Sequence, residues 1–149
     1  MPVRIDFAEV IDVTREDGRL VPRLFAADAI SDELRDAAAG GKVQYVVVTR
    51  VDGLVIGHNM PDPNLAKRLA AMSAAIVGTA IITTSELSRG RFLAASLETT
   101  EGHIVCLSAG DQAIVAGLAP KEVDLNLMTR VLRGLAGEVA EAIESWDSR

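Results

Sequence analysis

The sequence predicts an α+β fold, in which a five-stranded antiparallel sheet is flanked by helices in the order α-β-β-α-β-β-β-α. Three observations lead to this prediction. Short apolar runs are separated by turn signals such as Asp52-Gly53 and Thr100-Glu101-Gly102, and strands joined by tight turns must be antiparallel. A long uncharged segment interrupts the runs, and an amphipathic segment of helical length follows the last one. Helices that cover the faces of such a sheet give the simplest packing.

The composition places the chain among globular proteins. It has 149 residues, of which 49% are hydrophobic and 24% charged, which fits one domain with a core of ordinary size. A formal net charge of -6 argues against binding to nucleic acid or to anionic lipid. The single cysteine, Cys106, excludes an internal disulfide and a cysteine-cluster metal site. Asp6 and Glu9 interrupt the first ten residues, so we expect no signal peptide and a cytoplasmic protein.

Residues 1–25 are expected to form an N-terminal unit apart from the main domain, residues 26–149. The turn signal Glu16-Asp17-Gly18 stands between short apolar runs, which is compatible with a small hairpin or with an irregular arm. The main domain should begin with a helix from Ala26 to Ala39, which Gly40-Gly41 would end.

The five strands of the main domain are expected at residues 43–49, 54–57, 91–99, 103–108 and 113–118. The first is a nearly continuous apolar run, which is typical of a strand buried on both faces. Asp124 is suited to cap the final helix. Its apolar residues recur at intervals of three and four, as in a one-sided amphipathic helix: Met128, Leu132, Leu135, Val139, Ile143 and Trp146.

The central helix has the most informative sequence. Asp62-Pro63 is a favourable cap and first residue, and the stretch from Leu69 to Ser85 carries no charge. A surface helix is normally charged on one side, so this helix must be covered on more than one side. The second cover would be another copy or another protein; the alternative is a central core helix within a monomer. The run is too short and alanine-rich for a membrane span, and Lys67 and Arg68 precede it.

The residues of this helix divide into faces. The bulky residues share one face: Leu65, Leu69, Met72 and Ile76. Small residues form two ridges, Ala70-Ala74-Gly78 and Ala71-Ala75-Thr79, which would let another backbone approach closely. We interpret these faces as one for the sheet and one for a partner.

Catalytic motifs are missing from the sequence. No phosphate loop, dinucleotide fingerprint or nucleophile elbow is present. His58 and His103 are isolated in sequence and are expected at the rims of strands. We therefore expect no catalytic residue, no cofactor and no metal ligand. Arg89 and Arg91 flank Gly90 on a turn. Either they are solvated charges on a turn and an edge strand, where a charge hinders aggregation, or one of them is an arginine finger toward a partner GTPase.

Several segments, in their order and spacing, resemble the roadblock family, which includes a dynein light chain and a bacterial gliding-motility GTPase regulator. The matching segments are Val51–Ile56, Leu69–Ala75, Leu97-Glu98-Thr99 and Gly110–Val115, and the resemblance covers about residues 27 to 146. Residues 1–25 depart from the short form of the family.

The resemblance implies a homodimer, because family members pair their third strands and pack their central helices against each other. It would place these residues at the dimer interface: Leu65, Leu69, Ala70, Met72, Ser73, Ala74, Val77, Gly78, Ile81, Arg91, Phe92, Leu93, Ala94, Ala95, Ser96 and Leu97. Such an interface is isologous, with the same patch used by both copies.

The resemblance also implies a function. The family acts on small Ras-like GTPases as activators or as scaffolds, so we expect a non-catalytic regulator or scaffold, at most a GTPase-activating protein that acts on its partner. Lys67 and Arg68 are the candidate GTPase contacts. Two other functions stay open, a small-ligand sensor domain and a structural subunit of a larger complex.

Overall fold

The computed structural model describes residues 11–16, 19–24 and 43–147. Its main sheet has five antiparallel strands in the order β4-β3-β7-β6-β5, which confirms the predicted α+β fold class. The strands are β3 Tyr45–Arg50, β4 Val55–His58, β5 Ala95–Glu98, β6 Gly102–Ala109 and β7 Ala113–Pro120. The helices are α3 Pro63–Glu86 and α4 Leu125–Asp147.

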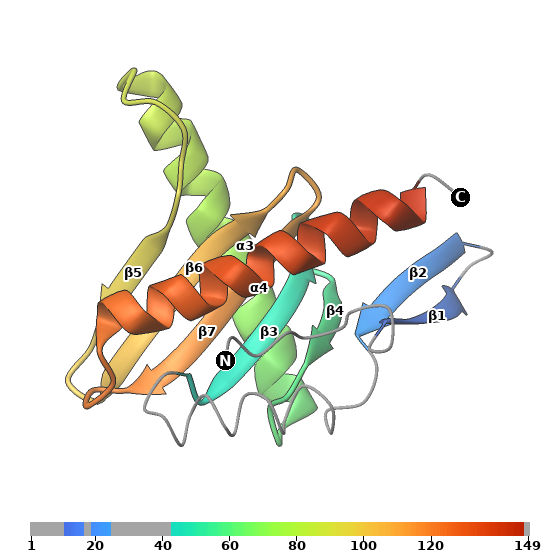
Figure 1. The fold of residues 1–149 in the computed structure, drawn as a ribbon, viewed down its shortest axis with the longest axis horizontal. Coiled ribbons are helices and arrows are strands. Elements are labelled where there is room, and N and C mark those ends of the chain that lie inside the picture. The colour runs from blue at the N-terminus through green and yellow to red at the C-terminus, as the bar shows by residue number, and fades with distance from the viewer. Residues whose placement is uncertain (1–10, 17–18, 25–42, 148–149) are drawn as a thin grey trace.

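The two helices lie on opposite faces of this sheet (Figure 1). On one face, strand residues such as Val48, Leu107 and Val115 pack against the apolar stripe of α4, in which Met128 and Leu132 are fully buried. On the other face, the alternate strand residues form a second core beneath α3: Val47, Cys106, Ile114 and Ala116. Strand β3 contributes to both cores, as its continuous apolar run predicts.

Both predicted helix caps are present. The Asp62 carboxylate accepts a hydrogen bond from the Asn64 backbone N–H at 2.9 Å, and Pro63 is the first residue of α3. The Asp124 carboxylate accepts one from the Leu127 N–H at 3.0 Å and caps α4. These bonds satisfy backbone donors that the first turn of a helix leaves unpaired.

The end of α3 reverses the chain sharply. The Arg89 N–H donates to the Thr84 carbonyl at 3.0 Å, and Ser88 takes the left-handed conformation with φ of 51°. This arrangement is a Schellman-type cap, in which glycine usually occupies the left-handed position that Ser88 takes here. It turns the chain back toward the sheet directly after the helix.

Strand β5 is shorter than the sequence predicts, because Ala95–Glu98 replaces the expected 91–99. The second half of α3 projects past the end of the sheet, and residues 87–94 run back along it to reach β5 (Figure 1). Residues 91–94 therefore accompany the helix instead of pairing with β6, and Phe92 packs among the residues of the α3 core.

The N-terminal segment contains a hairpin, which is one of the two alternatives from the sequence. Strand β1, Ile11–Glu16, pairs in antiparallel fashion with β2, Arg19–Leu24, in a separate two-stranded sheet. Strand β2 lies beside the edge strand β4. The predicted helix at 26–39 falls outside the described residues, and the division of the chain at residue 25 stays a prediction.

Two glycines give contrasting predictions for stability. A Cβ atom at Gly102 would lie 2.3 Å from the Ala119 carbonyl oxygen, whereas a Cβ at Gly134, on exposed α4 surface, would meet nothing within 4 Å. We expect Gly102→Ala to lower the free energy of unfolding by about 2 kcal/mol or more, because backbone must move. Gly134→Ala should raise it by roughly 1 kcal/mol, because alanine favours the helix.

Urea unfolding of the two variants and the wild type, at one fixed protein concentration, measures both changes. Equal stabilities for Gly102→Ala and the wild type would show that β6 and β7 are less closely packed at this point than the structure has them.

Candidate interaction surface

The side of α3 that packs on the sheet is made mainly of small residues, and the sequence had not specified which of the two faces would do so. Ala66, Ala70 and Ser73 are fully buried there, joined by Leu69 and Val77. Leu65 and Met72 instead point to solvent. The strands beneath already carry large residues such as Val47 and Ile114, so a helix with small side chains can approach them closely.

Residues of both small ridges pack against the turn between β3 and β4. Gly53 has φ of +89°, and a Cβ added there would lie 3.3 Å from the Ala71 Cα and 3.7 Å from the Ala74 Cβ. Glycine is needed at this turn both for its backbone conformation and for the closeness of the helix. Part of the ridges that looked available to a partner is therefore used inside the chain.

The outer side of α3 is apolar and open to solvent. Met72 is 52% exposed and Ile82 63% exposed, and Leu65 is also exposed. Ile81 is exposed too, but it lies about 180° around the helix from Met72, on the side that farther down faces the sheet. The returning segment and β5 add Leu93, which is 70% exposed, and Leu97. So many exposed large apolar side chains on one helix and its neighbouring segment make this part of the molecule the candidate interaction surface.

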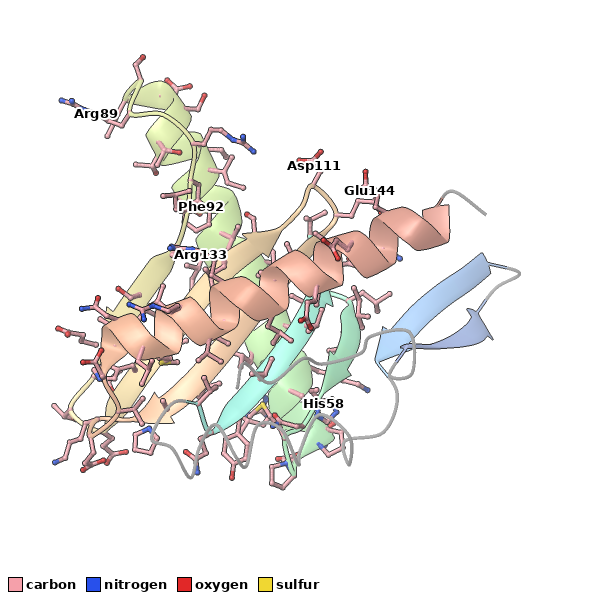
Figure 2. The ribbon with its side chains drawn as sticks, viewed as in Figure 1. His58, Arg89, Phe92, Asp111, Arg133 and Glu144 are labelled. Carbon is pink, nitrogen blue, oxygen red and sulfur yellow. The ribbon has the colours of Figure 1, made fainter. Side chains whose placement is uncertain are left out.

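An open apolar groove of about 600 Å³ lies between the projecting half of α3 and the segment that returns along it. Its walls are mostly small or β-branched residues of α3, and Phe92 stands on the opposite wall (Figure 2). Thr83 and Thr84, which also line the groove, donate their hydroxyl hydrogens to helix carbonyls, Thr83 to Thr79 at 2.7 Å and Thr84 to Ile81 at 3.0 Å. The groove therefore offers apolar contact and few free polar groups.

The sequence-predicted interface residues fall into three groups by exposure. The exposed ones are Leu65, Met72, Ile81, Arg91, Leu93, Ser96 and Leu97. The half-buried ones are Ala74, Gly78, Phe92, Ala94 and Ala95. Leu69, Ala70, Ser73 and Val77 are buried against the sheet of their own chain, and the assignment of the whole set to a dimer interface stays a prediction.

Four further exposed residues of α3, which the sequence-predicted interface does not include, lie on one side of the helix: Ala75, Thr79, Ile82 and Glu86. Ala75 and Thr79 belong to the second small ridge. The signal that identifies all four is their spacing of four, three and four, which repeats along one exposed face.

The charged and polar candidates lie around this surface. Lys67 and Arg68 are exposed in the first turns of α3, and Arg89 lies at the tip of the projecting arm (Figure 2). His58 ends β4, and its Nδ1 accepts a hydrogen bond from the Met60 N–H at 3.0 Å, which gives it a structural role. Among the residues that the structure describes, no group of three or more His, Cys, Asp or Glu residues could hold a metal ion.

Cys106 is buried between the sheet and α3. Its thiol donates to the Ser73 hydroxyl at a distance of 3.7 Å. Burial raises the pKa of the Cys106 thiol, and the hydrogen bond with Ser73 opposes that shift in part. The neutral, inert thiol expected from the sequence is consistent with this environment.

In length and composition, α3 is long and apolar enough to cross a membrane; no other helix in the described part of the chain is. The core helix of a soluble protein meets the same criterion. Here Ala66, Ala70 and Val77 pack against the sheet, so one side of α3 is a core face, and its other side is what needs explanation.

Five antiparallel strands in the order β4-β3-β7-β6-β5, with one helix on each face, define the class of α+β domain to which the chain belongs. A family model described as the Roadblock/LC7 domain matches residues 31–119, more than half of the chain. The protein therefore belongs to the Roadblock/LC7 family. The comparison with curated proteins gives no match.

Solved structures share the fold. A Roadblock/LC7 domain from Streptomyces avermitilis has a TM-score of 0.65 at 20% identity, and covers 69% of this chain and 87% of its own. MglB of Myxococcus xanthus has a TM-score of 0.68 at 17% identity, with 80% and 88% covered. The gliding protein MglB of Thermus thermophilus has a TM-score of 0.66 at 16% identity, with 83% and 96% covered.

The buried thiol gives a test of how firmly α3 is seated. We expect Cys106 to resist alkylation by iodoacetamide in the native protein at pH 8, because the thiolate is disfavoured and the sulfur is covered. In denaturant it should react at the rate of an ordinary thiol. Mass spectrometry of timed samples follows the modification, and rapid labelling of the folded protein would mean that α3 opens readily from the sheet.

Proposed function

We propose that this protein is a non-catalytic, cytoplasmic homodimer that regulates or holds a small Ras-like GTPase. The observation that carries the proposal is the exposed apolar side of α3 in a member of the Roadblock/LC7 family. A monomer would leave this side in water, and burial of apolar surface is the dominant driving force for association.

The edge strand β5 supports the same conclusion. The Thr99 N–H donates to the Gly102 carbonyl at 2.8 Å, so the alternating pattern directs the peptide groups of Leu97 and Ala95 to β6. The peptide groups of Ser96 and Glu98 then face the open edge. Pairing with a second β5 would cover this edge and the exposed Leu97 beside it. One MglB structure is described as having a tetrameric arrangement, which supports self-association in a protein of this fold.

The proposed GTPase contact is the start of α3, where Lys67 and Arg68 are exposed. They are cations on a protein whose net charge is -6, so they form a local site for an acidic patch of the partner. The dimer would act by binding and by orienting groups of the GTPase itself, since the candidate surface offers apolar and charged contacts. Stimulation of GTP hydrolysis is part of this proposal, with scaffolding as its simpler form.

A small-ligand sensor is the second candidate, and the groove beside Phe92 is the observation that bears on it. Ligand sites bury most of the surface of their ligand. This groove is open along its length and apolar, which fits another protein segment better than an enclosed small molecule.

The dimer is tested by light scattering coupled to size exclusion. We expect the wild type to have twice the monomer mass at micromolar concentration, and Ala75→Glu to be monomeric, because Ala75 lies exposed in the middle of the apolar side of α3. Arg133→Glu on the exposed side of α4 is the control and should stay dimeric. A monomeric wild type would refute the homodimer.

The GTPase contact is tested with purified small Ras-like GTPases of the source organism, loaded with GTP. We expect one of them to bind the wild-type dimer, and Lys67→Glu to weaken that binding about tenfold without splitting the dimer. Single-turnover hydrolysis with and without the protein separates activation from scaffolding. No binding to any of these GTPases would turn attention to the structural-subunit hypothesis.

A further inference from the structure

The main sheet ends in two edge strands, β4 and β5, and the chain covers only the first of them. Strand β2 of the N-terminal hairpin lies beside β4, and Figure 1 shows the hairpin beyond β4, on the side away from β3. Strands β2 and β4 nevertheless belong to separate sheets. The hairpin therefore covers the β4 edge without a ladder of backbone hydrogen bonds.

Hydrogen bonds at both ends of β4 fix the direction of its peptide groups. The Arg50 N–H donates to the Leu54 carbonyl at 2.9 Å, and the Asn59 N–H donates to the Val46 carbonyl at 3.2 Å. Leu54 and Asn59, which flank β4 on its two sides in the chain, are therefore bonded to β3.

The residues just inside these two positions face the open edge. Val55 lies opposite Thr49, and His58 lies opposite Val47. Because residues of an antiparallel pair alternate between bonded and unbonded positions, Val55 and His58 are at unbonded positions of the β3–β4 pair. Their peptide N–H and C=O groups thus point away from β3, toward the side where the hairpin lies.

Strand β2 is missing a donor on the side that faces away from β1. Glu16 and Arg19 lie opposite each other at the two-residue connection of the hairpin, and such a connection closes on a hydrogen-bonded pair. By the same alternation, Val21 is bonded to β1 and Pro22 faces away from it. Proline has no N–H, and its ring stands where the carbonyl of a neighbouring strand would bind. This side of β2 therefore cannot form a continuous ladder.

We propose that the β1–β2 hairpin is a displaceable guard of the β4 edge. It shields the outward peptide groups of Val55 and His58, and Pro22 prevents it from bonding to them. An uncovered edge strand is a template for pairing with another chain. A hairpin bonded to β4 would close the edge permanently, whereas contact without a ladder leaves few hydrogen bonds to break when the hairpin moves aside.

The displaced state defines the kind of partner that the edge accepts. With the hairpin aside, β4 can bind an extended strand of another protein through its main-chain groups, which is the usual way in which a sheet edge binds a peptide. The guard is independent of the proposed homodimer, because β4 and β5 are opposite edges of the sheet.

Hydrogen exchange followed by NMR tests the contact without a ladder. In the full-length wild type, and after correction for intrinsic rates, the amides of Val55 and His58 should exchange on the order of a hundredfold faster than those of Arg50 and Asn59. The latter two are hydrogen-bonded within the same pair of strands. Equal protection of all four amides would show that β2 is bonded to β4 and would overturn the proposal.

Restoring the missing donor tests the role of Pro22. Pro22→Val and Pro22→Ala each return an N–H to the outer side of β2, so exchange at Val55 and His58 should slow about tenfold or more as β2 joins the sheet. Pro61→Val is the control, because it removes an exposed proline from the loop after β4, and it should leave both amides unchanged. Wild-type exchange in both Pro22 variants would mean that Pro22 does not separate the strands.

Opening the hairpin tests the guarding function. Val21→Pro and Thr14→Pro each remove an N–H from the same bonded pair of β1 and β2, so either should detach β2 from β1. Analytical ultracentrifugation at one fixed concentration should then show species larger than the wild-type assembly, because the β4 edge can pair with a second copy. Retained protection of the Arg50 amide confirms that the main sheet is folded.

The outcomes separate the guard from the homodimer. Both hairpin variants at the wild-type mass, with the main sheet folded, would refute the guard whether the wild type is a monomer or a dimer. The exchange rates of the wild type and the Pro22 variants decide the question even if the opened variants do not fold. Fast exchange in the wild type, slow exchange in the Pro22 variants and association of the opened variants would together establish the guard.

Discussion

The structure depends on how α3 meets the sheet. Its inner side is built from Ala66, Ala70 and Ser73, with Leu69 and Val77 at the flanks, and these small residues let a 24-residue helix lie close to strands that are already rich in valine and isoleucine. Leu65, Met72 and Ile82 are thereby turned outward. The same packing that completes the core of one chain leaves apolar surface for another.

The projection of α3 beyond the sheet follows from its length. A helix from Pro63 to Glu86 is longer than the four- to eight-residue strands beneath it, so its second half has no sheet to cover (Figure 1). The chain must return along this half to reach β5, which shortens β5 and forms the groove beside Phe92. The short β5 and the groove are thus consequences of one long helix.

These features suit a protein that acts through contact. The candidate surface presents apolar side chains bounded by Lys67 and Arg68 at one end and Glu86 at the other. In protein interfaces generally, apolar contact supplies affinity, whereas charges at the edge of the contact favour one orientation of the partner and disfavour others. A regulator that works by holding or orienting another protein requires such a surface more than it requires a reactive group.

The sequence by itself determined the fold class, the order of the strands along the chain and both helix caps, because these follow from local signals: apolar periodicity, turn residues and the Asp62-Pro63 and Asp124 positions. It also identified α3 as a helix with two apolar sides. Only the tertiary structure decided which side of α3 faces the sheet. The hydrophobicity of Leu65 and Met72 would suit them to either side, and it is the limited space above Val47 and Ile114 that admits small residues there and leaves the two bulky ones in solvent. The tertiary structure likewise decided where β5 begins. Pairing with β6 is a contact between segments that are apart in the chain, so the local sequence of residues 91–94 could not show whether they pair.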